Sequence, residues 1–144
     1  MCIRDRATDG VWVSDGTLAG TTRLQQLDVI SSLTFWDGIL SAAPTWVDGL
    51  NKLFFVADDG INGWELWVTD GTVGGTQLVS NIHPGDSSSP TLLMSGDTYL
   101  LFSAQDSDGR AKLWKTDGSD AGTVLVSDIN PGGFGNFAFF TPGG

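Results

Sequence analysis

The chain of 144 residues is poor in several residue types, and each shortage excludes a class of protein. It has one cysteine, so no disulfide framework can form within it. Only 7 lysines and arginines stand against 17 acidic residues, and the net charge of −10 opposes binding to phosphate backbones and anionic lipids. The longest apolar run, 53–57, is far shorter than the ~20 residues that cross a bilayer. We therefore expect neither a nucleic-acid partner nor membrane insertion.

The acidic residues are unevenly divided, since sixteen are aspartate and Glu65 is the only glutamate. Aspartate favours turns over helix interiors, because its carboxylate hydrogen-bonds to nearby backbone. Twenty glycines, about twice the usual share, also indicate turns. Apolar residues make up 40% of the chain, among them six Trp and eight Phe, which is enough for a folded core. The composition therefore indicates a folded chain rich in turns and excludes a helical bundle.

Residues 1–6 fit no periodic pattern and are similar to the translation of a transposase adapter used in preparing sequencing libraries. We expect them to be a non-native leader, whose removal takes away the only cysteine. The remainder, 7–144, is expected to consist of tandem repeats truncated at both ends. A signal peptide that preceded the repeats would then not be visible.

Three copies of the pattern W-x-[ST]-D-G-[ST]-x-x-G-T organise the chain, at residues 12–21, 67–76 and 114–123. Successive tryptophans are 55 and 47 positions apart, and the longer interval has its extra residues around 31–46. Self-similarity at such a period indicates a repeat architecture. The signature positions are Trp12, Asp15, Gly16, Thr21, Trp67, Asp70, Gly71, Thr76, Trp114, Asp117, Gly118 and Thr123.

One period holds four strand-like runs, at residues 64–69, 76–82, 90–94 and 98–104. The segments 53–56 and 99–102 are apolar on both faces, which is typical of strands sandwiched between neighbouring sheets. Four short strands per period fit one blade of a β-propeller. We expect four-stranded antiparallel blades, about three of them, as an incomplete propeller fragment. Because closed propellers need at least about four blades, apolar faces and unpaired edges should remain and invite association.

The residue types of the signature predict structural roles. Tryptophan offers a flat surface of ~200 Å² that fills the gap between adjacent sheets. Asp70 is placed to accept a hydrogen bond from the backbone N–H two residues on, and Gly71 to supply the left-handed conformation of such a turn. Thr72 and Thr76 should satisfy polar groups of the turn and the strand edge. The signature is thus predicted to hold the fold.

Residues 65–76 read Glu-Leu-Trp-Val-Thr-Asp-Gly-Thr-Val-Gly-Gly-Thr and fit the bacterial ELWxxDGTxxGT repeat at every fixed position. The chain resembles this family from Ala7 to about Pro131. The resemblance implies a long secreted or surface protein of bacteria with tandem repeats believed to form β-propellers, often beside adhesion or sorting modules. An extracellular or cell-surface location follows from the resemblance as an expectation.

The other two copies depart from the family pattern. Lys112 replaces the glutamate and Ser119 a threonine in the third copy, and Gly10 and Val11 replace Glu-Leu in the first. The loop after the first copy carries an insertion with Phe-Trp at 35–36 in place of Pro-Gly-Ser. That loop is therefore expected to have a local role.

We expect a non-enzymatic module that serves binding, adhesion or display, whose partners are the remaining blades of its parent chain and a glycan or protein ligand. Phe35, Trp36 and Trp46 are the candidate ligand-binding residues, because exposed aromatic rings stack on sugars or anchor protein partners. Filling of core space created by the insertion is the alternative role for these three side chains.

Two turns resemble the start of a calcium loop, because oxygens at alternate positions can converge on one ion. The candidate ligands are Asp106 and Asp108 in one turn and Asp58 in the other. No bidentate glutamate follows at the spacing that an EF-hand requires, so ordinary turns are favoured. A structural spacer with calcium-stabilised turns is the alternative function, and no other cofactor is expected.

No catalytic residue is predicted. His83 is the only histidine; its repeat counterpart is Asn130, so a loop-capping role is favoured. The serine run 87–89 has no base nearby and no nucleophile elbow, and is predicted to be a solvated linker.

A piece of a sialidase-like propeller glycosidase is the least favoured alternative. Such enzymes bind a carboxylate with several arginines and use a tyrosine nucleophile. Beyond the leader only Arg23 and Arg110 remain, and the one tyrosine, Tyr99, lies in a strand expected to be buried.

Overall fold

The computed structural model describes residues 10–29 and 44–128. Within these ranges the chain forms antiparallel β-sheets and one 3-10 turn, η1 (Asp48–Leu50), and contains no α-helix. The described part of the chain thus has no helix that could cross a membrane. The prediction of an all-β fold is confirmed.

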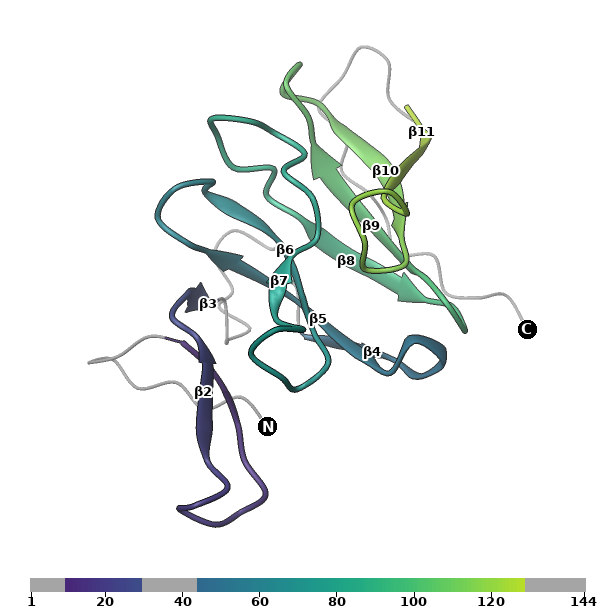
Figure 1. Cartoon of the computed structure of the whole chain (residues 1–144). Coiled ribbons are helices and arrows are strands. Elements are labelled where there is room, and N and C mark those ends of the chain that lie inside the picture. Colours follow the sequence, from purple (N-terminus) through teal and green to yellow (C-terminus); the bar gives the residue numbers. More distant parts are fainter. Residues whose placement is uncertain (1–9, 30–43, 129–144) are drawn as a thin grey trace.

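The described strands form three sheets that follow one another in chain order across the molecule (Figure 1). The first sheet is the hairpin of β1 (Val11–Val13) and β2 (Thr22–Gln25). The second consists of β4 (Thr45–Val47), β5 (Lys52–Asp58), β6 (Trp64–Thr69) and β7 (Gln77–Leu78), with β3 (Asp28–Val29) on the same edge of β5 as β4. The third consists of β8 (Thr91–Ser95), β9 (Leu100–Gln105), β10 (Ala111–Thr116) and β11 (Val124–Ser127).

The second and third sheets share one design. Each runs as an antiparallel meander in chain order, β4-β5-β6-β7 and β8-β9-β10-β11. The register is also the same, because Trp67 lies opposite Phe55 in the second sheet and Trp114 opposite Phe102 in the third. Trp12 lies on the first strand of the hairpin, so the first sheet corresponds to the last two strands of the other two.

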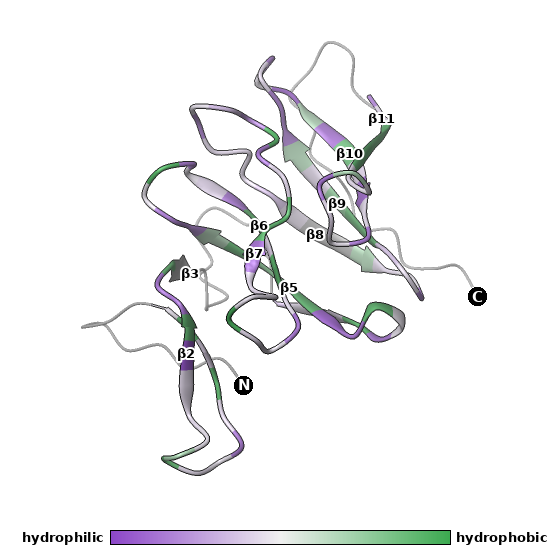
Figure 2. Ribbon diagram, viewed as in Figure 1, coloured by the Kyte–Doolittle hydropathy of each residue, from purple (hydrophilic) through white to green (hydrophobic). Residues whose placement is uncertain are grey.

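The second sheet is buried on both faces, because it lies between the other two sheets. Phe54 packs toward the third sheet and Phe55 toward the first, and each is at most 1% exposed. Hydrophobic residues are accordingly concentrated along β5 and β9 (Figure 2). The cluster between the second and third sheets comprises Val47, Phe54, Leu66, Val68, Val79, Leu100, Phe102 and Ala104, and that between the first and second comprises Val11, Leu24, Leu27, Phe55, Ala57 and Trp67.

The strand predictions hold best where the apolar pattern is strongest. The run 64–69 is β6, whereas the run predicted over 76–82 is wrong in length, because β7 covers only Gln77–Leu78. After it the chain turns toward the third sheet and reaches Gly85 with φ +90°. Tyr99 precedes β9 and is half-buried, so its expected burial within a strand is also wrong.

Candidate functional site

Each signature folds into a loop that is closed by its own side chains. In the second copy, Asp70 Oδ1 accepts hydrogen bonds from the Thr72 backbone N–H at 2.9 Å and from the Thr72 hydroxyl at 2.7 Å. The Thr72 hydroxyl oxygen accepts from the Gly75 N–H at 2.9 Å, and the Thr72 carbonyl accepts from the Thr76 hydroxyl at 2.6 Å. The turn predicted at Asp70 is confirmed.

A second layer of bonds joins the loop to its strands. Thr69 at the end of β6 places its hydroxyl oxygen 2.7 Å from that of Thr76, and it accepts a hydrogen bond from the Gly71 N–H at 3.0 Å. Gly71 has φ +90°, the left-handed conformation predicted for it. A Cβ atom at Gly75 would overlap the Asp70 carboxylate, which explains the second glycine of the signature.

The first and third copies repeat every one of these contacts with the equivalent residues. The hydrogen bonds from Thr72 lower the pKa of Asp70, those from Thr17 lower the pKa of Asp15, and those from Ser119 lower the pKa of Asp117. The signature carboxylates therefore stay ionised because turn donors surround them. The repeated polar residues thus close turns in all three sheets.

Removing the signature carboxylate should destabilise the fold moderately. We expect Asp70→Ala to lower the free energy of unfolding, because the donors of Thr72 lose their acceptor within the turn. Asp70→Asn keeps an oxygen at Oδ1 and should cost less. Urea denaturation followed by circular dichroism measures both effects. An unchanged denaturation midpoint in Asp70→Ala would show that the carboxylate does not stabilise the fold.

Glu65 on β6 is completely buried although it is a carboxylate. Its two oxygens accept hydrogen bonds from the Ser88 hydroxyl at 2.5 Å and the Ser88 N–H at 3.3 Å, and the backbone of Ile82 and His83 also donates to it. Burial raises the pKa of Glu65 to about 6, against the opposing effect of these hydrogen bonds. Through these hydrogen bonds Glu65 holds the segment between β7 and β8, which leads from the second sheet to the third, against β6.

The serine run 87–89 is part of the same junction, so the prediction of a solvated linker is wrong. Ser88 is completely buried, and its carbonyl accepts a hydrogen bond from the Gln105 N–H at 2.8 Å. Ser87 accepts from the Trp64 N–H at 3.0 Å, and the Ser89 N–H donates to the Trp64 carbonyl at 3.2 Å. Short side chains are needed here because the run passes between the start of β6 and the end of β9.

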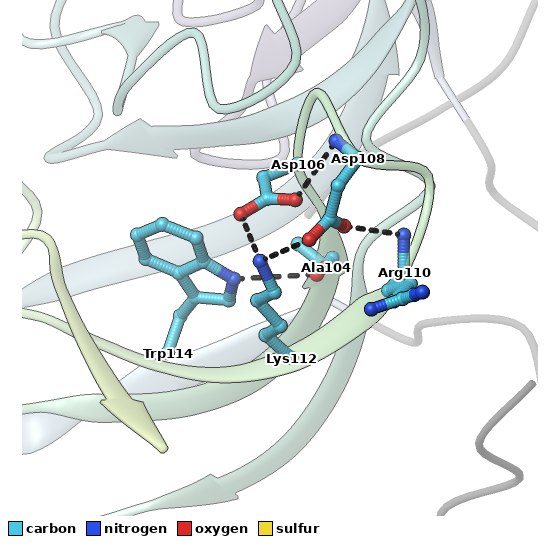
Figure 3. Close-up of polar contacts among 6 residues, drawn as sticks. All are labelled: Ala104, Asp106, Asp108, Arg110, Lys112 and Trp114. Atoms are coloured by element: carbon cyan, nitrogen blue, oxygen red, sulfur yellow. Dashed lines mark hydrogen bonds and ion pairs between the residues drawn. The ribbon is translucent and has the colours of Figure 1, made fainter. Parts of the chain in front are cut away.

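Lys112 is the counterpart of Glu65 in the third sheet and makes a different contact (Figure 3). Its ammonium lies 2.6 Å from Asp106 Oδ2 and 2.7 Å from Asp108 Oδ2. The two carboxylates, Asp106 first, raise the pKa of Lys112 to about 12, and the hydrogen bond from Lys112 is the main reason why the pKa of Asp108 falls to about 2. The indole N–H of Trp114 beside this cluster donates to the Ala104 carbonyl at 3.2 Å.

The structure therefore places an ammonium group between two of the calcium candidates, Asp106 and Asp108. The third candidate, Asp58, lies in another turn, where its Oδ1 accepts from the Gly60 N–H at 2.7 Å. Its neighbour Asp59 accepts from the backbone of Ile61 and Asn62. In residues 10–29 and 44–128, no group of three or more His, Cys, Asp or Glu side chains is arranged to hold a metal ion. Calcium binding stays a prediction.

We expect millimolar Ca²⁺ to leave the melting temperature unchanged, because the Lys112 ammonium already satisfies both carboxylates of its turn. Differential scanning fluorimetry with Ca²⁺ and, as a control, Mg²⁺ at equal ionic strength makes this measurement. A rise in melting temperature with Ca²⁺ alone would restore the spacer with calcium-stabilised turns.

Of the three aromatic candidates, only Trp46 lies within the described residues; Phe35 and Trp36 lie outside them. Trp46 is on β4, which is an edge strand of the second sheet in the described residues, and its side chain is 46% exposed. Its indole N–H donates to Asp48 Oδ1 at 2.9 Å, which fixes the orientation of the ring. His83, by contrast, has a buried Nδ1 without a hydrogen-bond partner in the described structure, so the predicted capping is not seen at that atom.

Comparisons of the chain with protein-family models, with curated proteins and with solved structures find no match. A functional assignment must therefore rest on the residues and the geometry described above.

Proposed function

We propose that the chain is a non-enzymatic repeat module of a secreted or cell-surface bacterial protein, in which its sheets are β-propeller blades of the ELWxxDGTxxGT type. The observation that carries the proposal is that two successive sheets share strand order and register and pack face to face, with Phe102 of the third sheet in one cluster with Phe54 and Leu66 of the second. Repeated four-stranded sheets of this kind are the units of propellers. The remaining blades of the parent chain would complete the assembly.

The use of the polar groups supports a role other than catalysis. The signature carboxylates accept hydrogen bonds from their own turns, Glu65 is buried against Ser88, and Lys112 is neutralised by two aspartates. Each of these groups stabilises a turn or a junction between strands. The module would accordingly act through its surface, in binding, adhesion or display.

Trp46 supports a ligand-binding role within that proposal. Its ring is exposed and held by Asp48, so stacking of a sugar ring on it would cost little side-chain entropy. Aromatic rings held in this way also anchor protein partners. We propose a surface glycan as the first ligand class to examine.

The test is an array of bacterial and host cell-surface oligosaccharides probed with the chain, followed by titrations of the best binder. Trp46→Ala should weaken binding at least about tenfold, whereas Trp46→Phe should retain most of it. Leu18→Ala, at an exposed loop residue of the first sheet, is the matched control and should bind as the original chain does. Equal affinity in Trp46→Ala, or the lack of any binder, would contradict the ligand-binding role.

A further inference from the structure

The turn between β5 and β6 contains Asn62-Gly63, and Asn62 is the only asparagine of the sequence that glycine follows. In such a pair the backbone nitrogen of the second residue can attack the side-chain amide carbon of the first, because glycine has no side chain to hinder the approach. Both residues are half-buried, and Ile61 beside them is 84% exposed. Water therefore has access to the turn.

The backbone nitrogen of Gly63 is not held by a hydrogen bond. Its N–H has no partner among residues 10–29 and 44–128, whereas the N–H groups on either side of it are both bonded. The Asn62 N–H donates to Asp59 Oδ1 at 2.8 Å, and the Trp64 N–H donates to the Ser87 hydroxyl at 3.0 Å. The nitrogen needed for ring closure is thus available.

The signature turns, where glycine follows aspartate, are protected from the equivalent reaction. The Gly71 N–H donates to the Thr69 hydroxyl at 3.0 Å. Asp70 also stays ionised, because hydrogen bonds from Thr72 lower its pKa, and a carboxylate repels the electron pair of an attacking nitrogen. The other two copies share both features.

The side chain of Asn62 joins the turn to a second segment. Its Nδ2 donates to Asp59 Oδ2 at 2.7 Å, and its Oδ1 accepts from Asn81 Nδ2 at 2.9 Å, in the segment that follows β7. Burial acts to raise the pKa of Asp59, but hydrogen bonds from Asn62 and Ile61 outweigh burial, and the pKa is lowered. An ionised carboxylate therefore lies beside the Asn62 amide.

The turn can open without disturbing the sheet. Residues 59–63 lie outside the strand ladder, since β5 ends at Asp58 and β6 begins at Trp64. Segments with few backbone hydrogen bonds open at a small cost in free energy. The Asn62 side chain can thus leave Asp59 and approach the Gly63 nitrogen while both strands stay paired.

We propose that Asn62 deamidates spontaneously through a cyclic imide with Gly63, and that the product weakens this turn. The Gly63 nitrogen loses its proton to hydroxide and attacks Asn62 Cγ. The bond from Cγ to Nδ2 then breaks, and the nitrogen takes a proton from water and leaves as ammonia. Water adds to either carbonyl of the ring and opens it, which leaves aspartate or isoaspartate at this position. Water is the only co-reactant.

The product replaces a hydrogen-bond donor with a second carboxylate. The new charge faces the ionised Asp59, which loses the donor that it had in the Asn62 amide. Isoaspartate also lengthens the backbone of the turn. We therefore expect deamidation to lower the midpoint of urea denaturation.

The test is incubation of the full chain in mildly alkaline buffer, followed by mass spectrometry of its peptides with fragmentation to locate the change. Asn62 should gain the mass difference between an amide and a carboxylate, as two separable isomers. It should convert at least about tenfold faster than Asn51 or Asn81, which are followed by lysine and isoleucine. Conversion of Asn62 no faster than that of Asn51 and Asn81 overturns the proposed site.

Asn62→Gln is the matched control for the chemistry. It keeps the amide but would need a larger and less favourable ring, so position 62 should stay unconverted over the same time. Conversion in this variant at the original rate would overturn the cyclic route.

Asn62→Asp represents one product and should lower the denaturation midpoint. Asn51→Asp adds the same charge at an exposed position of another turn and should leave it unchanged. An Asn62→Asp midpoint equal to that of the original chain overturns the proposed weakening. Neither measurement involves a ligand, so these outcomes are independent of the binding function proposed above.

Discussion

Replacing Trp67 with alanine should lower the free energy of unfolding by roughly 3–5 kcal/mol, the range for a large aromatic side chain removed from a core. The indole is 5% exposed and fills the boundary between the first and second sheets, where it packs with Phe55 and Leu24. Its removal leaves a cavity that neither sheet can close without shifting strands that are held by their neighbours. Urea denaturation followed by far-UV circular dichroism measures the change.

Trp46→Ala removes the same side chain from a half-exposed position and is the control for this experiment. It should cost less than about 1 kcal/mol. Trp67→Phe should fall between the two, because it keeps most of the apolar volume and removes a buried Nε1–H that has no hydrogen-bond partner in the described structure. A Trp67→Ala midpoint equal to that of Trp46→Ala would show that the tryptophan does not hold the sheets together.

The free energy of unfolding should decrease by about 1–2 kcal/mol as the pH rises from about 4.5 to about 7, and Glu65→Gln should abolish this decrease. The pKa of Glu65 is raised from 4.5 to about 6 in the folded chain, mainly by burial. Between these two values the folded state binds more protons than the unfolded state, so stability is greatest below this window and is lost as the pH rises through about 6.

The aspartates act in the opposite direction at lower pH. The pKa values of Asp15, Asp70 and Asp117 are lowered from 3.8, so their contributions are present above that value and are lost as the pH falls below it. Stability should therefore be highest between about pH 4 and 5. Denaturation midpoints across this range, in a His83→Asn background that removes the only imidazole, isolate the carboxylates. A pH dependence that persists in Glu65→Gln would contradict the assignment to Glu65.

The features that the sequence predicts well depend on neighbouring residues. The turn at Asp70 and the conformation of Gly71 follow from residues two positions apart, and the two buried faces of β5 follow from the apolar run 53–56. The turn repeats in each copy, so the pattern itself identifies it. The order of the strands in the second and third sheets follows from the same local succession of strand and turn.

The features that the sequence does not reveal depend on residues far apart in the chain. The bonds of Glu65 to Ser88 span 23 positions, and no local pattern distinguishes a buried serine from a solvated one. Asp106 and Asp108, named from the sequence as calcium candidates in a turn, are bound by Lys112, which stands at the signature position of the glutamate. The one indication in the sequence is the change of charge at this signature position, from Glu65 in the second copy to Lys112 in the third.

The closed signature loop allows whole repeats to be gained or lost during the evolution of the gene. Every hydrogen bond that shapes the loop joins residues within the same ten positions, so each copy carries its own closure with it. The packing positions recur with the same period, and a duplicated unit brings one face to receive its successor and one to cover its predecessor. Unequal recombination between copies of the gene segment would therefore add or delete whole sheets without leaving a loop polar group unpaired. Arrays of different length, encoded by closely related genes, are the expected evolutionary product of this architecture.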